Sequence, residues 1–250
     1  IINCCEQLLE NGCIELTKIK PNLLGQVEIE DIIKSIKVNT CLISIMFSNN
    51  EIGSINNVKQ IGKIAHLNNI PFHTDAVQGI GHFYFDLEQL PVDFLSSAAH
   101  KFHGPKGIGF SFVRKNSGLN PFIYGGAQER GLRAGTESVH NIVGMHKALE
   151  LAYKNLKEEK IKVTSLKDHF KSSILNIFPL ARFNGCSGEN SNSTYTLINV
   201  ALPISQEKVG LLDFHLDLKG VACSKGSACQ SGSSSGSHVL NAIQSEELKS

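Results

Sequence analysis

Short apolar runs alternate with helical patterns along residues 1–115 of the chain. Continuous apolar runs fit strands that are buried on both faces, whereas apolar residues at i, i+3 and i+4 fit amphipathic helices. The predicted strands are 13–19, 40–47, 70–74, 92–98 and 107–113, and the predicted helices are 4–9, 28–36 and 58–68. This strand–helix–strand order predicts an α/β fold, with a mostly parallel sheet covered by helices on both sides.

A long helix is predicted over residues 139–156, where it would lead into a second domain. The later pattern gives helices 164–177 and 206–217, strands 196–201 and 219–223, and a Gly/Ser-rich loop at 224–236. Such a loop composition favours mobility. We therefore expect a large domain over residues 1–157 and a smaller, truncated α+β domain over residues 158–250. The chain opens without a methionine, inside a predicted helix, and we expect it to be a fragment that lacks both ends.

Composition restricts the class of protein. The net charge is +1 and no basic stripe is visible, which argues against nucleic acid as the main partner. No apolar run reaches the roughly 18 residues of a membrane span. The seven cysteines are an odd number and contain no Cys-x-x-Cys pair, so neither a zinc knuckle nor a disulfide framework is indicated. A reducing compartment is expected, either the cytoplasm or an organelle matrix.

Three polar residues each follow a predicted strand: Asn50, Asp75 and Lys101. Ligands of open α/β sheets bind beyond the carboxyl ends of the strands, so all three are expected at one rim. A lysine in such a position can be desolvated and become nucleophilic, as imine chemistry requires. Lys106 is the competing lysine, but it lies in a Gly-Pro-Lys-Gly turn and is expected to be an exposed loop charge.

Asp75 and Gln78 lie one strand–helix–strand step upstream of Lys101. A carboxylate there could pair with the protonated ring nitrogen of pyridoxal phosphate and keep the ring able to accept electrons. The alternative is a capping aspartate at the start of the next helix. The presence of Lys101 favours the cofactor. His100 and His103 have the spacing of a metal pair, but without acidic or cysteine ligands nearby no metal site is expected.

Cys229 lies in the Gly/Ser-rich loop, where a thiol could reach a bound substrate as a nucleophile once it is activated. The alternative is a free loop cysteine without a role. Cys223 ends a predicted apolar strand and is expected to be buried. Structural roles are expected for the remaining cysteines, which are Cys4, Cys5, Cys13, Cys41 and Cys186.

Residues 125–137 combine glycines, arginines and a threonine, as either an anion-binding loop or a plain surface loop would.

Taken together, these motifs resemble the cysteine desulfurases, which are fold-type I pyridoxal phosphate enzymes related to the class V aminotransferases. The matching segments run in family order over nearly the whole chain: 48–53, 73–78, 99–107, 131–137 and 226–229. The Gly-Ser-Ala-Cys sequence that ends at Cys229 resembles the NifS/IscS-like branch, which serves iron–sulfur cluster assembly. The other branch carries an Arg-x-Gly-x-His-Cys loop, which is absent here.

The resemblance implies a role for each residue of the rim. Lys101 would hold the cofactor covalently and later move the protons of the substrate. Asp75 would pair with the pyridine nitrogen, and Gln78 would hydrogen-bond the phenolic oxygen of the ring. Asn50 would contact the ring or the substrate carboxylate, and His100 would contact the cofactor phosphate.

The resemblance also implies partners. Thr136 would reach the phosphate bound by a partner subunit, which implies a homodimer. Cys229 would attack the sulfur of L-cysteine, release L-alanine and keep the sulfur as a persulfide. The sulfur would then pass to an iron–sulfur scaffold or another acceptor protein, with a transient iron–sulfur contact at Cys229 as the only expected metal contact.

The chain departs from the family pattern in three places. Ala98 stands where the family usually has a phosphate-binding serine, and Ser97 is a poor substitute because alternate strand residues face opposite sides. The Gly-Thr phosphate loop and ring-stacking histidine of the family, and its carboxylate-binding arginine, lie outside this sequence. The alternatives are a selenocysteine lyase or aminotransferase relative, which needs no loop cysteine, and an inactive sulfur-transfer scaffold.

Overall fold

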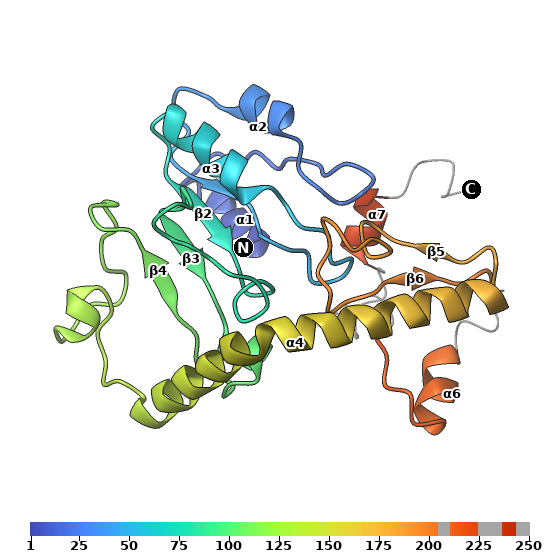
Figure 1. Cartoon of the computed structure of the whole chain (residues 1–250). Helices are drawn as coiled ribbons and strands as arrows, with labels where there is room; N and C mark the ends of the chain where they lie inside the picture. Colours follow the sequence, from blue (N-terminus) through green and yellow to red (C-terminus); the bar gives the residue numbers. More distant parts are fainter. Residues whose placement is uncertain (205–210, 225–236, 244–250) are drawn as a thin grey trace.

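The computed structural model describes residues 1–204, 211–224 and 237–243. Its main sheet has the strand order β1-β2-β3-β4 (Figure 1). β1 and β2 pair in parallel, as do β2 and β3, whereas β3 and β4 are antiparallel. The mostly parallel sheet is therefore confirmed. The bounds of the strands are Ile43–Ser44 (β1), Phe72–Asp75 (β2), Phe94–Ser96 (β3) and Ser111–Val113 (β4).

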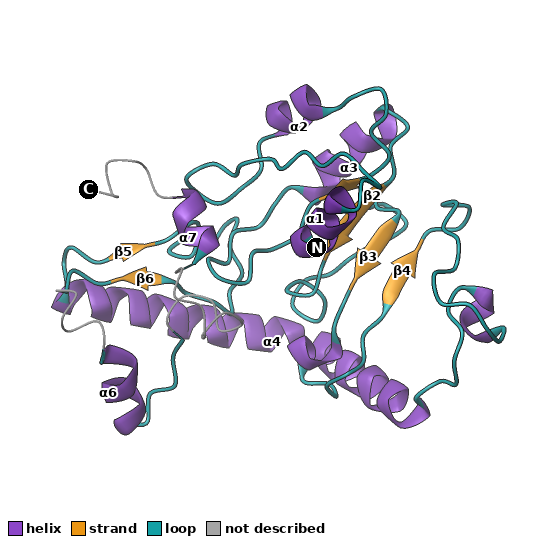
Figure 2. Cartoon of the chain, turned by 180° about the vertical axis from the view of Figure 1, so that it is seen from behind, coloured by secondary structure: helices purple, strands orange, loops and turns teal. Residues whose placement is uncertain are grey.

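Helices lie on both sides of this sheet. Figures 1 and 2 show α1 and α3 on opposite faces, with α2 beside α3. The bounds are Ile2–Glu10 (α1), Ile29–Ser35 (α2), Val58–Leu67 (α3), Val139–Ile177 (α4), Leu212–Leu218 (α6) and His238–Ile243 (α7), with 3-10 helices at Ala99–Phe102 (η1) and Gln128–Gly131 (η2). The predicted α/β class is confirmed.

α3 begins and packs as its sequence indicates. The Asn57 side chain accepts a hydrogen bond from the Gln60 N–H at 3.1 Å, which satisfies one of the free amides of the first turn. Ile61 and Ala65 are fully buried on the sheet-facing side. Between them Gly62 permits a close approach, because a Cβ there would lie 2.0 Å from the Pro91 carbonyl oxygen.

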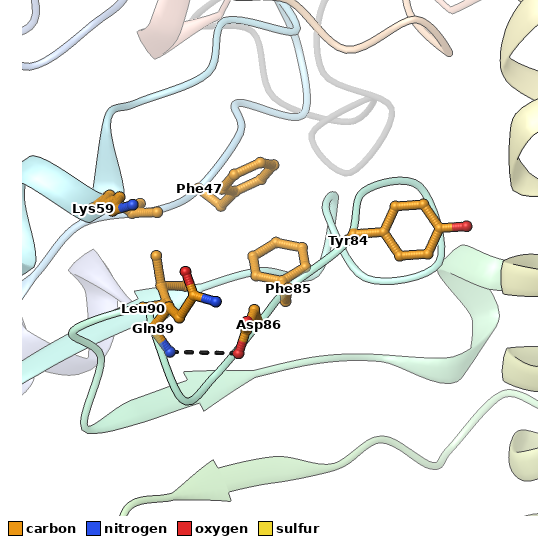
Figure 3. A pocket seen from close by; sticks show the side chains of 8 residues that line it. Phe47, Lys59, Tyr84, Phe85, Asp86, Gln89 and Leu90 are labelled. Carbon is orange, nitrogen blue, oxygen red and sulfur yellow. Dashed lines mark hydrogen bonds between the residues drawn. The ribbon is translucent and has the colours of Figure 1, made fainter.

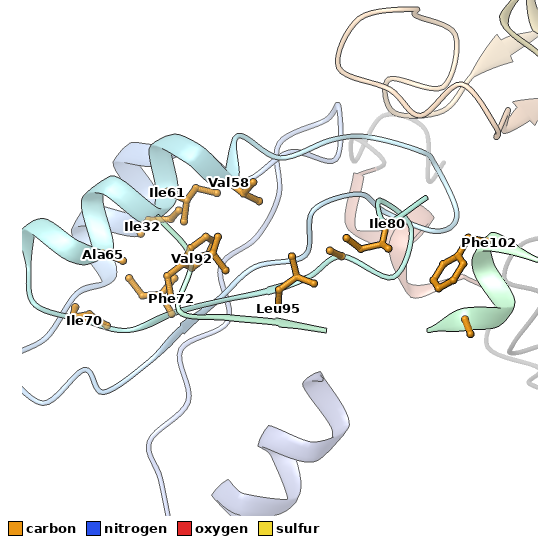
Figure 4. Close-up of a cluster of buried hydrophobic side chains, with 13 residues drawn as sticks. Ile32, Val58, Ile61, Ala65, Ile70, Phe72, Ile80, Val92, Leu95 and Phe102 are labelled. Atoms are coloured by element: carbon orange, nitrogen blue, oxygen red, sulfur yellow. The ribbon is translucent and has the colours of Figure 1, made fainter. Parts of the chain in front are cut away.

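The core lies between α3 and the sheet and continues along the sheet toward η1 (Figure 4). Phe72 of β2 packs against the buried face of α3, and Leu95 of β3 belongs to the same cluster. Phe102 of η1 is also fully buried and belongs to the same cluster. The turn that carries Lys101 is therefore anchored by its own hydrophobic residue.

α4 is a single helix of 39 residues, where two separate helices were predicted. In Figure 1 it runs across the lower part of the molecule, above α6, from the main sheet to a second, two-stranded sheet. That sheet is antiparallel and consists of β5 (Arg182–Phe183) and β6 (Val200–Ala201). The predicted domain division at residue 157 falls inside α4 and stays a prediction.

Several predicted elements differ in the structure. Residues 13–19 form no strand, although Ile19 packs against the core. β1 covers only two residues of the predicted strand 40–47. Residues 219–223 form no strand, and Cys223 is exposed, so its predicted burial is wrong. Of the cysteines assigned to structural roles, Cys186 is buried, whereas Cys4, Cys13 and Cys41 are exposed.

Candidate active site

The carboxyl ends of β1, β2 and β3 meet at one edge of the sheet. These strands are adjacent and parallel, so the segments that follow them leave the sheet on the same side. Asn50 follows β1, Asp75 ends β2 and Lys101 follows β3. The structure thus brings the three predicted rim residues to the same edge.

Asp75 is half-buried, and its backbone contacts the neighbouring segment on each side of β2. Its carbonyl oxygen accepts the Phe47 N–H at 2.8 Å, and its Cα pairs in register with Ser96 of β3. One carboxylate oxygen accepts the Val77 N–H at 3.1 Å. The carboxylate therefore makes a local turn contact, but no helix follows it as the capping alternative expects, and within the described residues Oδ2 makes no hydrogen bond.

Lys101 lies in η1, the short helix that follows β3. Its N–H donates to the Ala98 carbonyl at 3.1 Å, and the Gly104 N–H donates to the Ala99 carbonyl at 2.8 Å. The side chain is half-buried, and no described residue accepts a hydrogen bond from its Nζ. A primary amine is thus held at the sheet edge by a turn with its own backbone hydrogen bonds.

The other predicted site residues are distributed differently. Gln78 is half-buried in the turn directly after Asp75, and His100 is exposed beside Lys101 in η1. Thr136 is exposed in the loop before α4 and is not brought together with these residues by any described contact. Cys229 lies outside the described residues.

The turn that carries Asn50 is held from the second half of the chain. The Gly53 carbonyl in this turn accepts the Thr194 N–H at 2.8 Å. Lys167 of α4 is buried, and its Nζ donates to the Ser193 hydroxyl at 3.1 Å and to the Thr194 carbonyl at 3.0 Å. Burial lowers the pKa of Lys167 to about 8. A buried ammonium group therefore fixes the segment on which the Asn50 turn rests.

A histidine of β2 links the three parallel strands on the face that leads to Asp75. One ring nitrogen of His73 lies 2.8 Å from the Ser44 hydroxyl of β1, and the other lies 3.0 Å from the Ser96 hydroxyl of β3. Burial lowers the pKa of His73, although the Asp75 carboxylate opposes this shift. The neutral ring is favoured, and it aligns the strand ends at the site.

Ser97 and Ala98 directly follow β3 and differ in burial. Ser97 is buried, and its hydroxyl has no hydrogen-bond partner among the described residues. Ala98 is only half-buried and directly precedes the Lys101 turn. The prediction that Ser97 is a poor substitute for the hydroxyl that Ala98 lacks stays a prediction.

The donor set at this edge fits pyridoxal phosphate. An aldehyde needs the amine of Lys101, a protonated pyridine nitrogen needs a carboxylate such as Asp75, and a phenolic oxygen accepts a hydrogen bond from an amide such as Gln78. All three side chains are half-buried rather than fully exposed. By contrast, no group of three or more His, Cys, Asp or Glu side chains in the described part of the chain could hold a metal ion.

A shallow pocket lies elsewhere, between the start of α3 and the segment 84–90 (Figure 3). Phe47 and Phe85 line it, and their rings meet edge to face at 4.9 Å. None of the predicted site residues lines this pocket. Phe47 connects it to the site through its backbone hydrogen bond to Asp75.

Two residues near the site were not found from the sequence. His82 contacts the carbonyl oxygen of Lys101 at 3.0 Å, and Lys167 supports the Asn50 turn. A lone histidine after Gly81 and a lysine in a long charged helix carry no recognisable sequence signal. Only the fold brings them to these positions.

Comparison with known proteins agrees with this arrangement. Residues 1–243 match the family described as aminotransferase class-V. The chain is 43% identical over 235 residues to the cysteine desulfurase IscS of Dictyoglomus turgidum, covering 94% of this chain and 58% of that protein. It is 40% identical to the mitosomal cysteine desulfurase of Encephalitozoon cuniculi, covering 97% of this chain and 55% of the relative.

Solved structures agree as well. A NifS-like protein superposes with a TM-score of 0.83 at 33% identity, covering 95% of this chain and 61% of that one. A structure described as SspA in complex with cysteine gives a TM-score of 0.79, also at 33% identity, covering 98% and 66%. The chain thus spans less than two thirds of the length of these proteins. From the family match over nearly all its residues and the fold it shares with these structures, the chain belongs to the aminotransferase class-V family.

Proposed function

We propose that the protein containing this chain is a pyridoxal phosphate-dependent cysteine desulfurase that converts L-cysteine to L-alanine. The observation that carries the proposal is the meeting of Asn50, Asp75 and Lys101 at the carboxyl edge of three parallel strands. Relatives described as cysteine desulfurases, 40–43% identical over most of the chain, support the choice of substrate.

Bound pyridoxal phosphate supplies an electron sink for the substrate, and the residues of this chain hold and orient it. Lys101 holds the cofactor aldehyde through Nζ, and Asp75 keeps the pyridine nitrogen protonated. Gln78 hydrogen-bonds the phenolic oxygen, and His100 contacts the phosphate. Asn50 orients the ring or the substrate carboxylate.

The sulfur transfer assigns two further tasks. Lys101 Nζ moves protons to and from the carbon atoms of the substrate. The Cys229 thiolate attacks the substrate sulfur, so that an S–S bond forms while the C–S bond of the substrate breaks. The carbon released from sulfur takes up a proton. The products are L-alanine and a persulfide on Cys229, and the atoms balance without an external oxidant.

We further propose a homodimer, with Thr136 reaching the phosphate site of the second copy. Large apolar side chains near Thr136 are exposed, with Phe122 at 92%, Tyr124 at 80% and Val139 at 65% of their full surface. Exposed apolar patches of this kind mark interaction surfaces.

The sulfur acceptor is an iron–sulfur scaffold or another carrier protein, and the compartment is the cytoplasm or an organelle matrix. No helix in the described residues is long and apolar enough to span a membrane.

The first test concerns the lysine. The full-length protein is loaded with pyridoxal phosphate, reduced with borohydride and digested for peptide mapping. The pyridoxyl group is expected on Lys101, because Lys101 lies in η1, directly after β3, at the sheet edge that it shares with Asp75. Modification of Lys106 instead would overturn the assignment, since Lys106 is exposed in the following turn.

The second test separates the desulfurase from an inactive scaffold. Cys229→Ser in the full-length protein is expected to keep the cofactor absorbance but to abolish alanine release and persulfide formation, because a hydroxyl is a much weaker nucleophile than a thiolate. Cys223→Ser is the matched control, since Cys223 is an exposed thiol six positions upstream. A persulfide on Cys223, or normal turnover of the Cys229 variant, would contradict the proposal.

A further inference from the structure

His82 connects the lysine turn to the second half of the chain. It follows Gly81, whose φ of +85° and close approach to Phe102 bring this backbone directly against η1. Its Nε2 lies 3.0 Å from the carbonyl oxygen of Lys101, and its Nδ1 lies 3.1 Å from the Tyr195 hydroxyl. The His82 side chain is only 12% exposed. Both nitrogens of a nearly buried imidazole are thus engaged.

The tautomer of His82 follows from these partners. A carbonyl oxygen only accepts, so Nε2 carries the proton that it donates to Lys101. The group that faces Nδ1 is the Tyr195 hydroxyl, which has a single proton to donate and is also within hydrogen-bond distance of Glu159. The hydrogen bond to the Lys101 carbonyl does not depend on which of these two groups receives that proton.

Tyr195 and Glu159 complete the connection. The Tyr195 hydroxyl lies 3.2 Å from a carboxylate oxygen of Glu159, which is also 3.8 Å from Nδ1 of His82. Tyr195 is 5% exposed, and its ring meets that of His82 edge to face at 5.8 Å. Burial and the Glu159 charge raise the pKa of Tyr195, so the phenol keeps its proton.

α4 fixes the backbone on both sides of His82. The Tyr153 hydroxyl of α4 accepts the Gly81 N–H at 3.4 Å and donates to the Phe83 carbonyl at 3.2 Å. Lys160, one residue after Glu159, lies over the Phe83 ring at 5.7 Å. The imidazole is therefore held in position from α4 and from the segment before β6.

We propose that His82, supported by Tyr195 and Glu159, is a positioning residue for Lys101. By hydrogen-bonding the Lys101 carbonyl it fixes the orientation of the η1 turn, and hence the direction in which Nζ leaves the sheet edge. The relevance of this role to catalysis rests on the proposed function, in which Lys101 holds the cofactor. The hydrogen bond itself is a property of the cofactor-free protein.

Two variants of His82 distinguish its two contacts. His82→Gln keeps an amide N–H near the position of Nε2, so it can still donate to the Lys101 carbonyl. His82→Asn retains a polar group only near the position of Nδ1, so it loses that bond. Neither side chain titrates. Tyr195→Phe removes the phenol alone, and Tyr84→Phe is its matched control, because Tyr84 is 75% exposed.

The primary readout is amide hydrogen exchange in the cofactor-free, full-length protein. Losing one hydrogen bond is expected to speed exchange at the Lys101 and Gly104 amides about 3- to 10-fold in His82→Asn. His82→Gln should stay close to wild type. Tyr195→Phe should give a smaller increase and Tyr84→Phe none. Nitrogen chemical shifts of His82 should report a proton on Nε2.

The outcomes separate this proposal from the proposed function. Equal exchange in the Asn and Gln variants, or an Nε2 without a proton, would overturn the positioning role, whatever the enzyme does. Borohydride trapping on Lys101 should be slower in His82→Asn and close to normal in His82→Gln. If wild type is not trapped on Lys101, the proposed function fails, while the exchange data still decide the role of His82.

Discussion

Replacing Lys167 by methionine tests how the second half of the chain supports the Asn50 turn. Methionine keeps the apolar stem but removes the donor to the Ser193 hydroxyl and to the carbonyls of Glu189 and Thr194. The Thr194 carbonyl still accepts from the Ser193 hydroxyl, whereas the Glu189 carbonyl and the Ser193 oxygen lose this donor. Ser193 is buried, and leaving a buried acceptor without its donor costs about 1–3 kcal/mol, which is the expected loss in unfolding free energy near neutral pH.

The pH dependence gives a sharper expectation. The folded-state pKa of Lys167 is about 8, below its ordinary value of 10.5, because burial disfavours the charge. Between these values the unfolded chain binds more protons, so the contribution of Lys167 to stability rises with pH. Integrated from about pH 7 to about pH 9.5, the gain is on the order of 2 kcal/mol.

Urea unfolding at both pH values measures this gain as the difference between wild type and Lys167→Met. Lys162→Met is the matched control, since Lys162 is exposed on the same helix. Its effect should stay within about 0.5 kcal/mol at either pH. If wild type and Lys167→Met lose or gain stability in parallel across this range, Lys167 is not a buried cation and the reasoning is wrong.

Three further predictions concern the sheet and its edge. Gly62→Ala should lower the unfolding free energy by about 1–3 kcal/mol, because its Cβ would lie 2.0 Å from the Pro91 carbonyl; an unchanged urea midpoint would contradict this. Because burial lowers the pKa of His73 below 6.5, wild type should lose stability as pH falls through this value, whereas His73→Gln should show a flatter urea-midpoint profile. Ala98→Ser should tighten pyridoxal phosphate binding about tenfold or more in fluorescence titrations of the full-length protein, and no change would mean that backbone amides or Ser97 already serve the phosphate.

The sheet edge could be predicted because its signals are local. Apolar runs before Asn50, Asp75 and Lys101 indicate buried parallel strands, and parallel strands bring their carboxyl ends together. The strand predicted at 13–19 is wrong for a related reason. Ile19 is apolar because it packs against the core, but no described strand pairs with that segment. Apolar content indicates burial and does not by itself distinguish a strand from a packed loop.

The supporting contacts could not be predicted because they join segments far apart in the sequence. β5 consists of Arg182 and Phe183 alone, which is too short for alternation to be visible. Lys167 resembles any exposed lysine of a charged helix, and only tertiary packing buries it. The predicted burial of Cys223 depended on a strand over residues 219–223, and the prediction is wrong because no strand forms there. Such errors follow directly from a wrong local assignment.

The unbroken course of α4 has a consequence for insertions and deletions. Tyr153 and Glu159 contact the residues around His82, and Lys167 contacts the segment that holds the Asn50 turn, all from one helix. Each residue of an α-helix advances the side-chain direction by about 100° and the axis by about 1.5 Å. Deleting one residue between Glu159 and Lys167 would therefore rotate Lys167 by about 100° relative to Tyr153, away from its acceptors. The number of residues between these contacts is as constrained as their identity, and length variation in this family is expected in the loops and not in this stretch of helix.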